Sequence, residues 1–177
     1  FMGLPDSLDI CSMWGGIPAK ENTEIWDEIR FVQKVKGTKM LCVAITRIDA
    51  ETDEHDFKKA YNEAKAMPEG DERTAALNRS FEMYAEYFLD QVFLNDLDGF
   101  FLSGSNFEYF YKHMAKYMGP NPDITKEERL QLIEERYGKE IASQEGICDK
   151  MLNIDQTSTS MTSLVPYSNY CFLQAYS

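Results

Sequence analysis

The stretch KMLCVAITRI, residues 39–48, is a nearly continuous apolar run that contains Val, Ile and Thr. A strand with one face in water alternates apolar and polar residues, whereas a strand covered on both faces is apolar throughout. The run is therefore typical of a strand inside a parallel sheet that has helices packed against it. This stretch predicts that the chain belongs to the α/β class.

Four further strand-like runs alternate along the chain with segments of helical periodicity. The strand-like runs lie at 7–14, 39–48, 96–104, 150–155 and 169–177, and the helical segments lie at 22–37, 77–92, 107–117 and 125–141. No hairpin turn separates consecutive strands, so the strands are predicted to run parallel and to be joined through helices. Residues 49–73 are charged and are predicted to be irregular. The chain has 177 residues, 44% of them hydrophobic, which predicts one domain over residues 1–177.

Local signals predict where the helices begin and end. Asn22 or Thr23 can cap the first helix, and Gly37 can end it. Thr125 and Glu128 form the pattern of a capping box. Helical spacing predicts that the helix opened by this box buries Leu130, Ile133, Tyr137 and Ile141.

Five strands are fewer than the eight of a closed (β/α)8 barrel, which usually takes about 250 residues. The chain is therefore predicted to form either an open parallel sheet or an incomplete barrel. Both architectures bind ligands at the carboxyl ends of their strands. The residues at those ends are the candidates for function.

Charge and composition exclude several classes of partner. A formal charge of -12 disfavours nucleic acids and anionic membrane surfaces, because both would be repelled. No apolar run approaches the roughly 20 residues of a membrane-spanning helix, and FMGLPDSLD lacks the features of a signal peptide. The four cysteines stand apart and are interpreted as buried free thiols.

Aromatic and neutral polar residues follow the predicted strands. Such a lining suits a sugar, which offers apolar C–H faces for stacking and many hydroxyls for hydrogen bonding. The residues at these strand ends are Trp14, Arg47, Asp49, Ser103, Ser105, Asn106, Asp155, Gln156, Gln174 and Tyr176.

Three other kinds of site are not supported by the spacing of their residues. The acidic loop 49–56 has Glu54 and Ala60 where a calcium-binding EF-hand loop needs Gly and Glu. The two histidines have no second ligand at zinc-site spacing. Ser103 does not fit the nucleophile elbow, because Phe101 occupies one of the two places where a glycine is required. No metal and no cofactor is therefore predicted.

Four segments together resemble glycoside hydrolase family 18, in particular the endo-β-N-acetylglucosaminidase-like branch of gut Bacteroidetes. They are LPDSLDICSMWGG, EIRFVQKVKGTKMLCVAI, LDGF and NYCFLQAYS, in this order between Leu4 and Ser177. The most specific pieces are SMWGG with KGTKML, the Asp-Gly of LDGF, and the terminal QAY. The resemblance implies a partial (β/α)8 barrel that contains the second to sixth strands of the family. It also implies an extracellular, cell-surface or periplasmic location, for example as a surface lipoprotein.

The family motif on the fourth strand is incomplete in this chain. In the family, Asp-Gly is followed at alternate positions by two Asp and one Glu; the Glu is the general acid, and the preceding Asp orients the substrate's N-acetyl group. Asp98 and Gly99 match the start, but Phe101, Ser103 and Ser105 replace Asp, Asp and Glu. A serine hydroxyl has too high a pKa to serve as a general acid. The resemblance therefore implies that the family mechanism is absent.

Several interpretations remain open at this stage. The leading one is a non-catalytic barrel, a pseudoenzyme that binds N-acetylglucosamine-containing glycans, in which Tyr176 contacts the N-acetyl carbonyl. Its glycan contacts are predicted to be Trp14, Asp98, Ser103, Ser105, Asn106, Asp155, Gln174 and Tyr176. One alternative is an active endo-β-N-acetylglucosaminidase or chitinase-like hydrolase with a relocated general acid such as Glu108. Another is a purely structural or protein-binding role, and structural roles are also open for Asp98 at the base of the barrel and for Tyr176 in the core.

Overall fold

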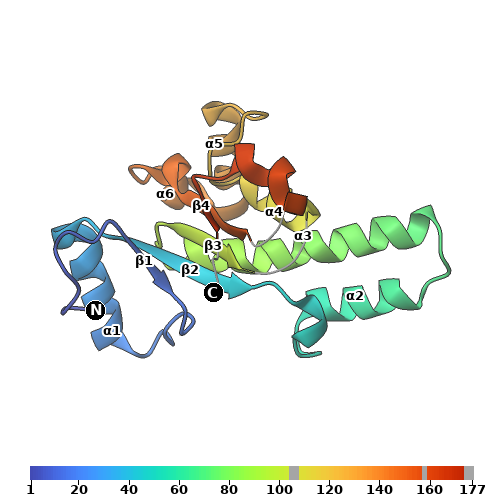
Figure 1. The fold of residues 1–177 in the computed structure, drawn as a ribbon, viewed down its shortest axis with the longest axis horizontal. Coiled ribbons are helices and arrows are strands. Elements are labelled where there is room, and N and C mark those ends of the chain that lie inside the picture. Colours follow the sequence, from blue (N-terminus) through green and yellow to red (C-terminus); the bar gives the residue numbers. More distant parts are fainter. Residues whose placement is uncertain (104–107, 157–158, 174–177) are drawn as a thin grey trace.

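The computed structural model describes residues 1–103, 108–156 and 159–173, and this part of the chain contains one five-stranded sheet (Figure 1). The strands are β1 (Ile10–Met13), β2 (Lys39–Ile45), β3 (Gly99–Ser103), β4 (Met151–Gln156) and β5 (Tyr170–Leu173). They lie side by side in chain order, and every neighbouring pair is parallel. The predicted parallel α/β sheet of five strands is confirmed.

The strand order identifies the sheet as part of a barrel. In a doubly wound sheet the order reverses at a switch point. Here each connection adds the next strand on the same side of the previous one. Because such connections are right-handed, they place the helices on one face of the sheet. The chain thus forms a partial (β/α)8-type barrel with an outer face, covered by helices, and an inner face.

The hydrophobic core lies between the outer face of the sheet and the helices. The following outward residues of the central strands are buried there: Met40, Cys42, Ala44, Phe100, Leu102, Leu152 and Ile154. Side chains alternate between the two faces of a strand, so Val43 and Ile45 belong to the inner face. Ile45 is 50% exposed. The apolar run 39–48 predicted cover on both faces, but within the described residues only the outer face is fully covered.

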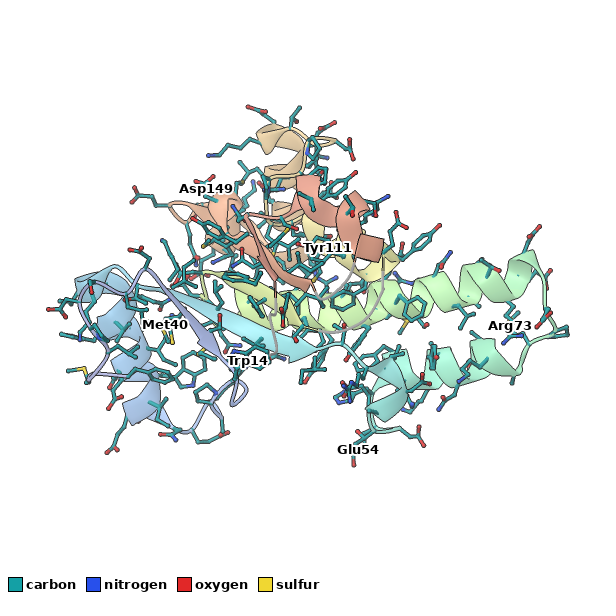
Figure 2. All side chains as sticks on the ribbon, in the orientation of Figure 1. Trp14, Met40, Glu54, Arg73, Tyr111 and Asp149 are labelled. Atoms are coloured by element: carbon teal, nitrogen blue, oxygen red, sulfur yellow. The ribbon has the colours of Figure 1, made fainter. Side chains whose placement is uncertain are left out.

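Helices of different lengths make up the outer layer (Figure 1). They are α1 (Thr23–Phe31), continued by the π-helical η1 (Val32–Lys36), then α2 (Asp56–Ala66), α3 (Asp71–Phe93), α4 (Glu108–Ala115), α5 (Lys126–Tyr137) and α6 (Lys139–Ala142). Short 3-10 segments occur as η2 (Ile48–Ala50), η3 (Ile147–Asp149) and η4 (Thr159–Tyr167). The predicted helical segments are confirmed in position. The hairpin of α2 and α3 extends beyond the sheet, with Arg73 near its tip (Figure 2).

The prediction that residues 49–73 are irregular was wrong, because α2 occupies 56–66. Phe57, Tyr61 and Ala64 are buried, and their spacing of four and three residues places them on one face of the helix. The aromatic rings of this face pack on α3, as the Phe57–Tyr84 centroid distance of 4.6 Å shows. Three apolar residues among many charges form too sparse a pattern for recognition from the sequence.

The predicted helix ends were partly correct. The capping box is present, since Thr125 Oγ1 accepts a hydrogen bond from the Glu128 backbone N–H at 3.2 Å and Glu128 Oε2 accepts one from Thr125 N–H at 2.8 Å. Gly37 ends η1 in the left-handed conformation, with φ 74°. Asn22 is at the N-cap of α1, but its side chain makes no capping hydrogen bond. The first turn of α1 is therefore not held by the predicted cap.

The predicted buried stripe after the capping box extended too far. Ile133 is fully buried, but Leu130 is 38% exposed. Helix α5 stops at Tyr137 because Gly138 takes a positive φ of 84°, and Ile141 belongs to α6. The buried residues of α5 are Arg129 and Ile133, so Arg129 takes the buried position that was predicted for Leu130.

The four cysteines are free thiols, as predicted, but they differ in burial. Cys42 and Cys148 are buried, Cys11 is half-buried, and Cys171 is exposed on the edge strand. Burial raises the pKa of the Cys42 thiol to about 12, so this thiol is unreactive near neutral pH. Among the helices of the described ranges, none has the length and hydrophobicity required to cross a membrane.

Candidate binding face

A row of aromatic rings crosses the inner face of the sheet. Trp14 directly follows β1, Phe101 lies in β3, and Tyr170 and Phe172 lie in β5. The ring centroids are 5.8 Å apart for Trp14 and Phe101, 5.2 Å for Phe101 and Phe172, and 6.3 Å for Phe172 and Tyr170. These distances are typical of favourable aromatic contacts. We refer to these four residues as the aromatic row.

The aromatic row is buried at its centre and open at its ends. Phe101 is 6% exposed, whereas Trp14, Tyr170 and Phe172 are 56%, 52% and 42% exposed. In Figure 2, Trp14 lies beside β1 and β2, away from Tyr111, which lies among the helices. A hollow of about 360 Å³ adjoins Trp14 and is also lined by Ser12, Gly15, Gly16, Ile17 and Asn22. Flat apolar rings beside an open hollow are suited to the C–H face of a sugar.

A polar pair lies at the carboxyl ends of β3 and β4. Ser103 and Asp155 are register partners, and Ser103 Oγ donates a hydrogen bond to Asp155 Oδ2 at 3.2 Å. Burial raises the pKa of the Asp155 carboxyl, and the hydrogen bond from Ser103 opposes this effect. Asp155 Oδ1 has no hydrogen-bond partner although it is buried. The structure thus brings two of the predicted glycan contacts together.

Asp98 lies at the opposite end of the sheet from these groups. It directly precedes β3, and its Oδ2 accepts hydrogen bonds from Gln33 Nε2 at 2.7 Å and from the Met40 backbone N–H at 2.9 Å. Lys39 Nζ lies 3.4 Å from Oδ1. This position fits the structural alternative for Asp98, in which the carboxylate joins α1–η1, β2 and β3 at the base of the barrel. Asp98 therefore lies away from the binding face.

Glu108 lies in the outer helical layer. Its carboxylate pairs with Lys112 Nζ at 2.6 Å, and its side chain is 57% exposed. It lines a groove of about 350 Å³ with residues of α3 and α4, including Glu82 and His113. A hollow of about 600 Å³ next to Tyr167 is likewise formed by α4, α5 and their flanking segments. Neither of these cavities is lined by a residue of the aromatic row.

The remaining predicted contacts, Ser105, Asn106, Gln174 and Tyr176, lie outside the described residues and stay predictions. Among the residues that the structure describes, no three His, Cys, Asp or Glu side chains are placed to hold a metal ion. The sequence analysis missed three residues of the inner face: Asn153, Tyr170 and Phe172. Alternation within 150–155 and 169–173 assigns Asn153 to the same face as Asp155, and Tyr170 to the same face as Phe172.

Parallel strands in sequential order, an outer layer of helices and a candidate site at the strand ends define a protein of the (β/α)8-barrel class. A sequence model of "Glycoside hydrolase family 18, BT1044-like" matches residues 1–177. The chain therefore belongs to glycoside hydrolase family 18, in its BT1044-like group.

Two solved structures share this fold. One is a selenomethionine BT1044 with a Glu-to-Gln substitution, which is 21% identical in sequence and superimposes with a TM-score of 0.54. The match covers 98% of this chain and 50% of the BT1044 chain. The other is a mutant endo-β-N-acetylglucosaminidase from Cordyceps militaris in complex with fucosyl-N-acetylglucosamine-Asn. It is 16% identical in sequence and superimposes with a TM-score of 0.51, and the match covers 98% of this chain and 49% of the fungal chain. This chain thus spans about half the length of either structure. No protein of curated function matches it significantly.

Proposed function

We propose that the inner face of this barrel binds N-acetylglucosamine-containing glycans without cleaving them. The proposal rests mainly on the position of Phe101 in the sheet. Its position in the family motif is that of an Asp, but here the ring is buried between Trp14 and Phe172 and completes the aromatic row. The strand that carries the acids in the family therefore contributes to an apolar platform in this chain.

The chemistry of β3 supports binding rather than hydrolysis. After Asp98 at its base, the described part of this strand contributes Phe101 and Ser103 to the inner face. Neither side chain can protonate a glycosidic oxygen near neutral pH, and loss of general acid help costs roughly 10²–10⁴-fold in rate. The aromatic row supplies stacking surface, and Ser103 and Asp155 supply hydrogen-bonding groups at its side.

The ligand class is proposed from a relative, and the location is proposed from the resemblance to the family. The Cordyceps militaris structure contains fucosyl-N-acetylglucosamine-Asn, which supports an N-acetylglucosamine ligand for this chain. The protein is proposed to work outside the cell or in the periplasm, where such glycans are encountered. Cell fractionation with an antibody to this chain would test the location.

The proposal is tested by measuring binding and cleavage with the same preparation. The full chain is titrated with chitin oligosaccharides and with high-mannose and complex glycoproteins in a calorimeter, and each mixture is then searched by mass spectrometry for released glycan. We expect binding without release. Release by the wild-type chain would contradict a non-catalytic function, and failure to bind any of these glycans would contradict the ligand class.

Substitution of Trp14 tests the part played by the aromatic row. Trp14→Ala is expected to weaken glycan binding about tenfold, because it removes a half-exposed ring at the end of the row. The matched control is Tyr109→Ala, which removes a ring of similar exposure, 54%, from α4 in the outer layer. Equal losses in the two variants would contradict a site on the inner face.

One observation favours the alternative of an active hydrolase with a relocated acid. Asp155 is a buried carboxyl at the end of a strand, and burial raises its pKa toward the range of a general acid. Glu108, the acid suggested by the sequence, is instead exposed and paired with Lys112. If glycan is released, Asp155→Asn should abolish the release and Glu108→Gln should leave it unchanged.

A further inference from the structure

Two polar side chains on the inner face of β4 each have a buried atom without a hydrogen-bond partner. They are Asn153 Nδ2 and Asp155 Oδ1. Asn153 is 0% exposed and Asp155 is 4% exposed. Because they are two residues apart in a strand, both side chains lie on the same face, about 6–7 Å from each other along the strand.

The other polar atoms of these side chains have fixed partners. Asn153 Oδ1 accepts a hydrogen bond from the Tyr170 backbone N–H at 3.1 Å, which sets the orientation of the side-chain amide. Asp155 Oδ2 accepts the hydrogen bond from Ser103. One free donor and one free acceptor are therefore left on the same face of β4. Native proteins leave few buried polar atoms unpaired, so two on one face of a strand require an explanation.

The aromatic row covers this pair. Strands β3 and β5 flank β4, and neighbouring strands are about 4.8 Å apart, so β3 and β5 are about 10 Å apart. The Phe101 and Phe172 rings nevertheless approach to 5.2 Å, which means that they reach toward each other across β4. In the register, Phe101 is beside Asn153 and Phe172 is beside Asp155. Phe172 is 42% exposed, and access of a ligand to the buried pair requires this ring to move outward.

A secondary amide matches the free donor and acceptor. Its N–H and C=O point in opposite directions across a trans bond, so it needs an acceptor on one side and a donor on the other. We propose that Asn153 and Asp155 bind the acetamido group of the glycan, with Asn153 Nδ2 donating to its carbonyl and Asp155 Oδ1 accepting from its N–H. This inference rests on the proposed function, and it names the group by which N-acetylglucosamine is distinguished from glucose.

The test compares two ligands that differ at this group alone. Fully N-acetylated chitotetraose, called chitotetraose below, and cellotetraose share a β-1,4-linked backbone, but the former has an acetamido group where the latter has a hydroxyl. Calorimetric titration of the full chain should show a preference for chitotetraose. Asp155→Leu, which removes the acceptor, and Asn153→Asp, which keeps the acceptor for Tyr170 N–H but removes the donor, should each reduce that preference about tenfold or more. Tyr109→Ala, which removes an exposed ring from α4 in the outer layer, should leave it within about twofold.

The outcomes separate this inference from the proposed function. If the wild-type chain prefers chitotetraose and both variants, folded by circular dichroism and thermal unfolding, keep that preference, the assignment of Asn153 and Asp155 is overturned while glycan binding stands. If the wild-type chain binds neither sugar, the proposed function fails. A third titration uses N-acetyl-Ala-Ala-amide: binding as tight as that of chitotetraose would identify the ligand amide as peptide and overturn the sugar assignment.

Discussion

Replacement of Asp98 by Ala should destabilise the protein by about 3 kcal/mol and leave glycan affinity unchanged. The carboxylate accepts hydrogen bonds from Gln33 Nε2 at 2.7 Å and from Met40 N–H at 2.9 Å. A hydrogen bond to a charged group contributes about 1.5–3 kcal/mol. Gln33 is only partly buried and regains water in the variant, but Met40 is fully buried and its N–H is left unpaired. The exposed ion pair with Lys39 adds little.

Urea unfolding followed by circular dichroism measures the loss of stability. Asp149→Ala is the matched control, because this carboxylate is 68% exposed and makes only a 3.5 Å ion pair with Lys126. The control should change the free energy of unfolding by less than about 0.5 kcal/mol. Chitotetraose affinity is measured on both variants at a temperature where each is folded. A loss of affinity in Asp98→Ala without a loss of stability would refute our structural assignment of Asp98.

Three further predictions concern the outer layer. Arg129→Met should cost about 3 kcal/mol in urea unfolding, because the buried guanidinium donates to the carbonyls of Cys148 at 3.0 Å and Met118 at 3.3 Å, and Met removes these donors. A change below about 1 kcal/mol would contradict this. Thr125→Ala should raise the free energy of the folded state by about 1 kcal/mol through loss of the capping box, measured as a lower thermal midpoint, with Thr125→Ser as the conservative control. Burial lowers the pKa of His113, so the unfolded chain, with a histidine pKa of about 6.5, binds the proton more tightly. Stability should therefore fall as pH decreases from 7 to 5, and His113→Gln should reduce that fall; an unchanged pH dependence in the variant would show that His113 does not contribute.

The candidate site was only partly predictable from the sequence. Trp14, Ser103 and Asp155 were identified because they follow or end recognisable strands, and carboxyl ends of parallel strands lie at one edge of the sheet. Asp98 was assigned to the same set from its place in the motif, yet it lies one strand length away at the base. Asn153 and Phe172 were not identified, since their importance depends on the register between β3, β4 and β5.

The sequence by itself determined the class of fold, the number of strands and the replacement of the family acids at Phe101 and Ser103. These properties are local, because an apolar run or a motif is complete within about ten residues. The tertiary structure decided which residues meet: the aromatic row joins positions as far apart as Trp14 and Phe172, and the hydrogen bond between Ser103 and Asp155 joins neighbouring strands. Such contacts depend on strand order and register, and these follow from long-range packing that no local pattern encodes.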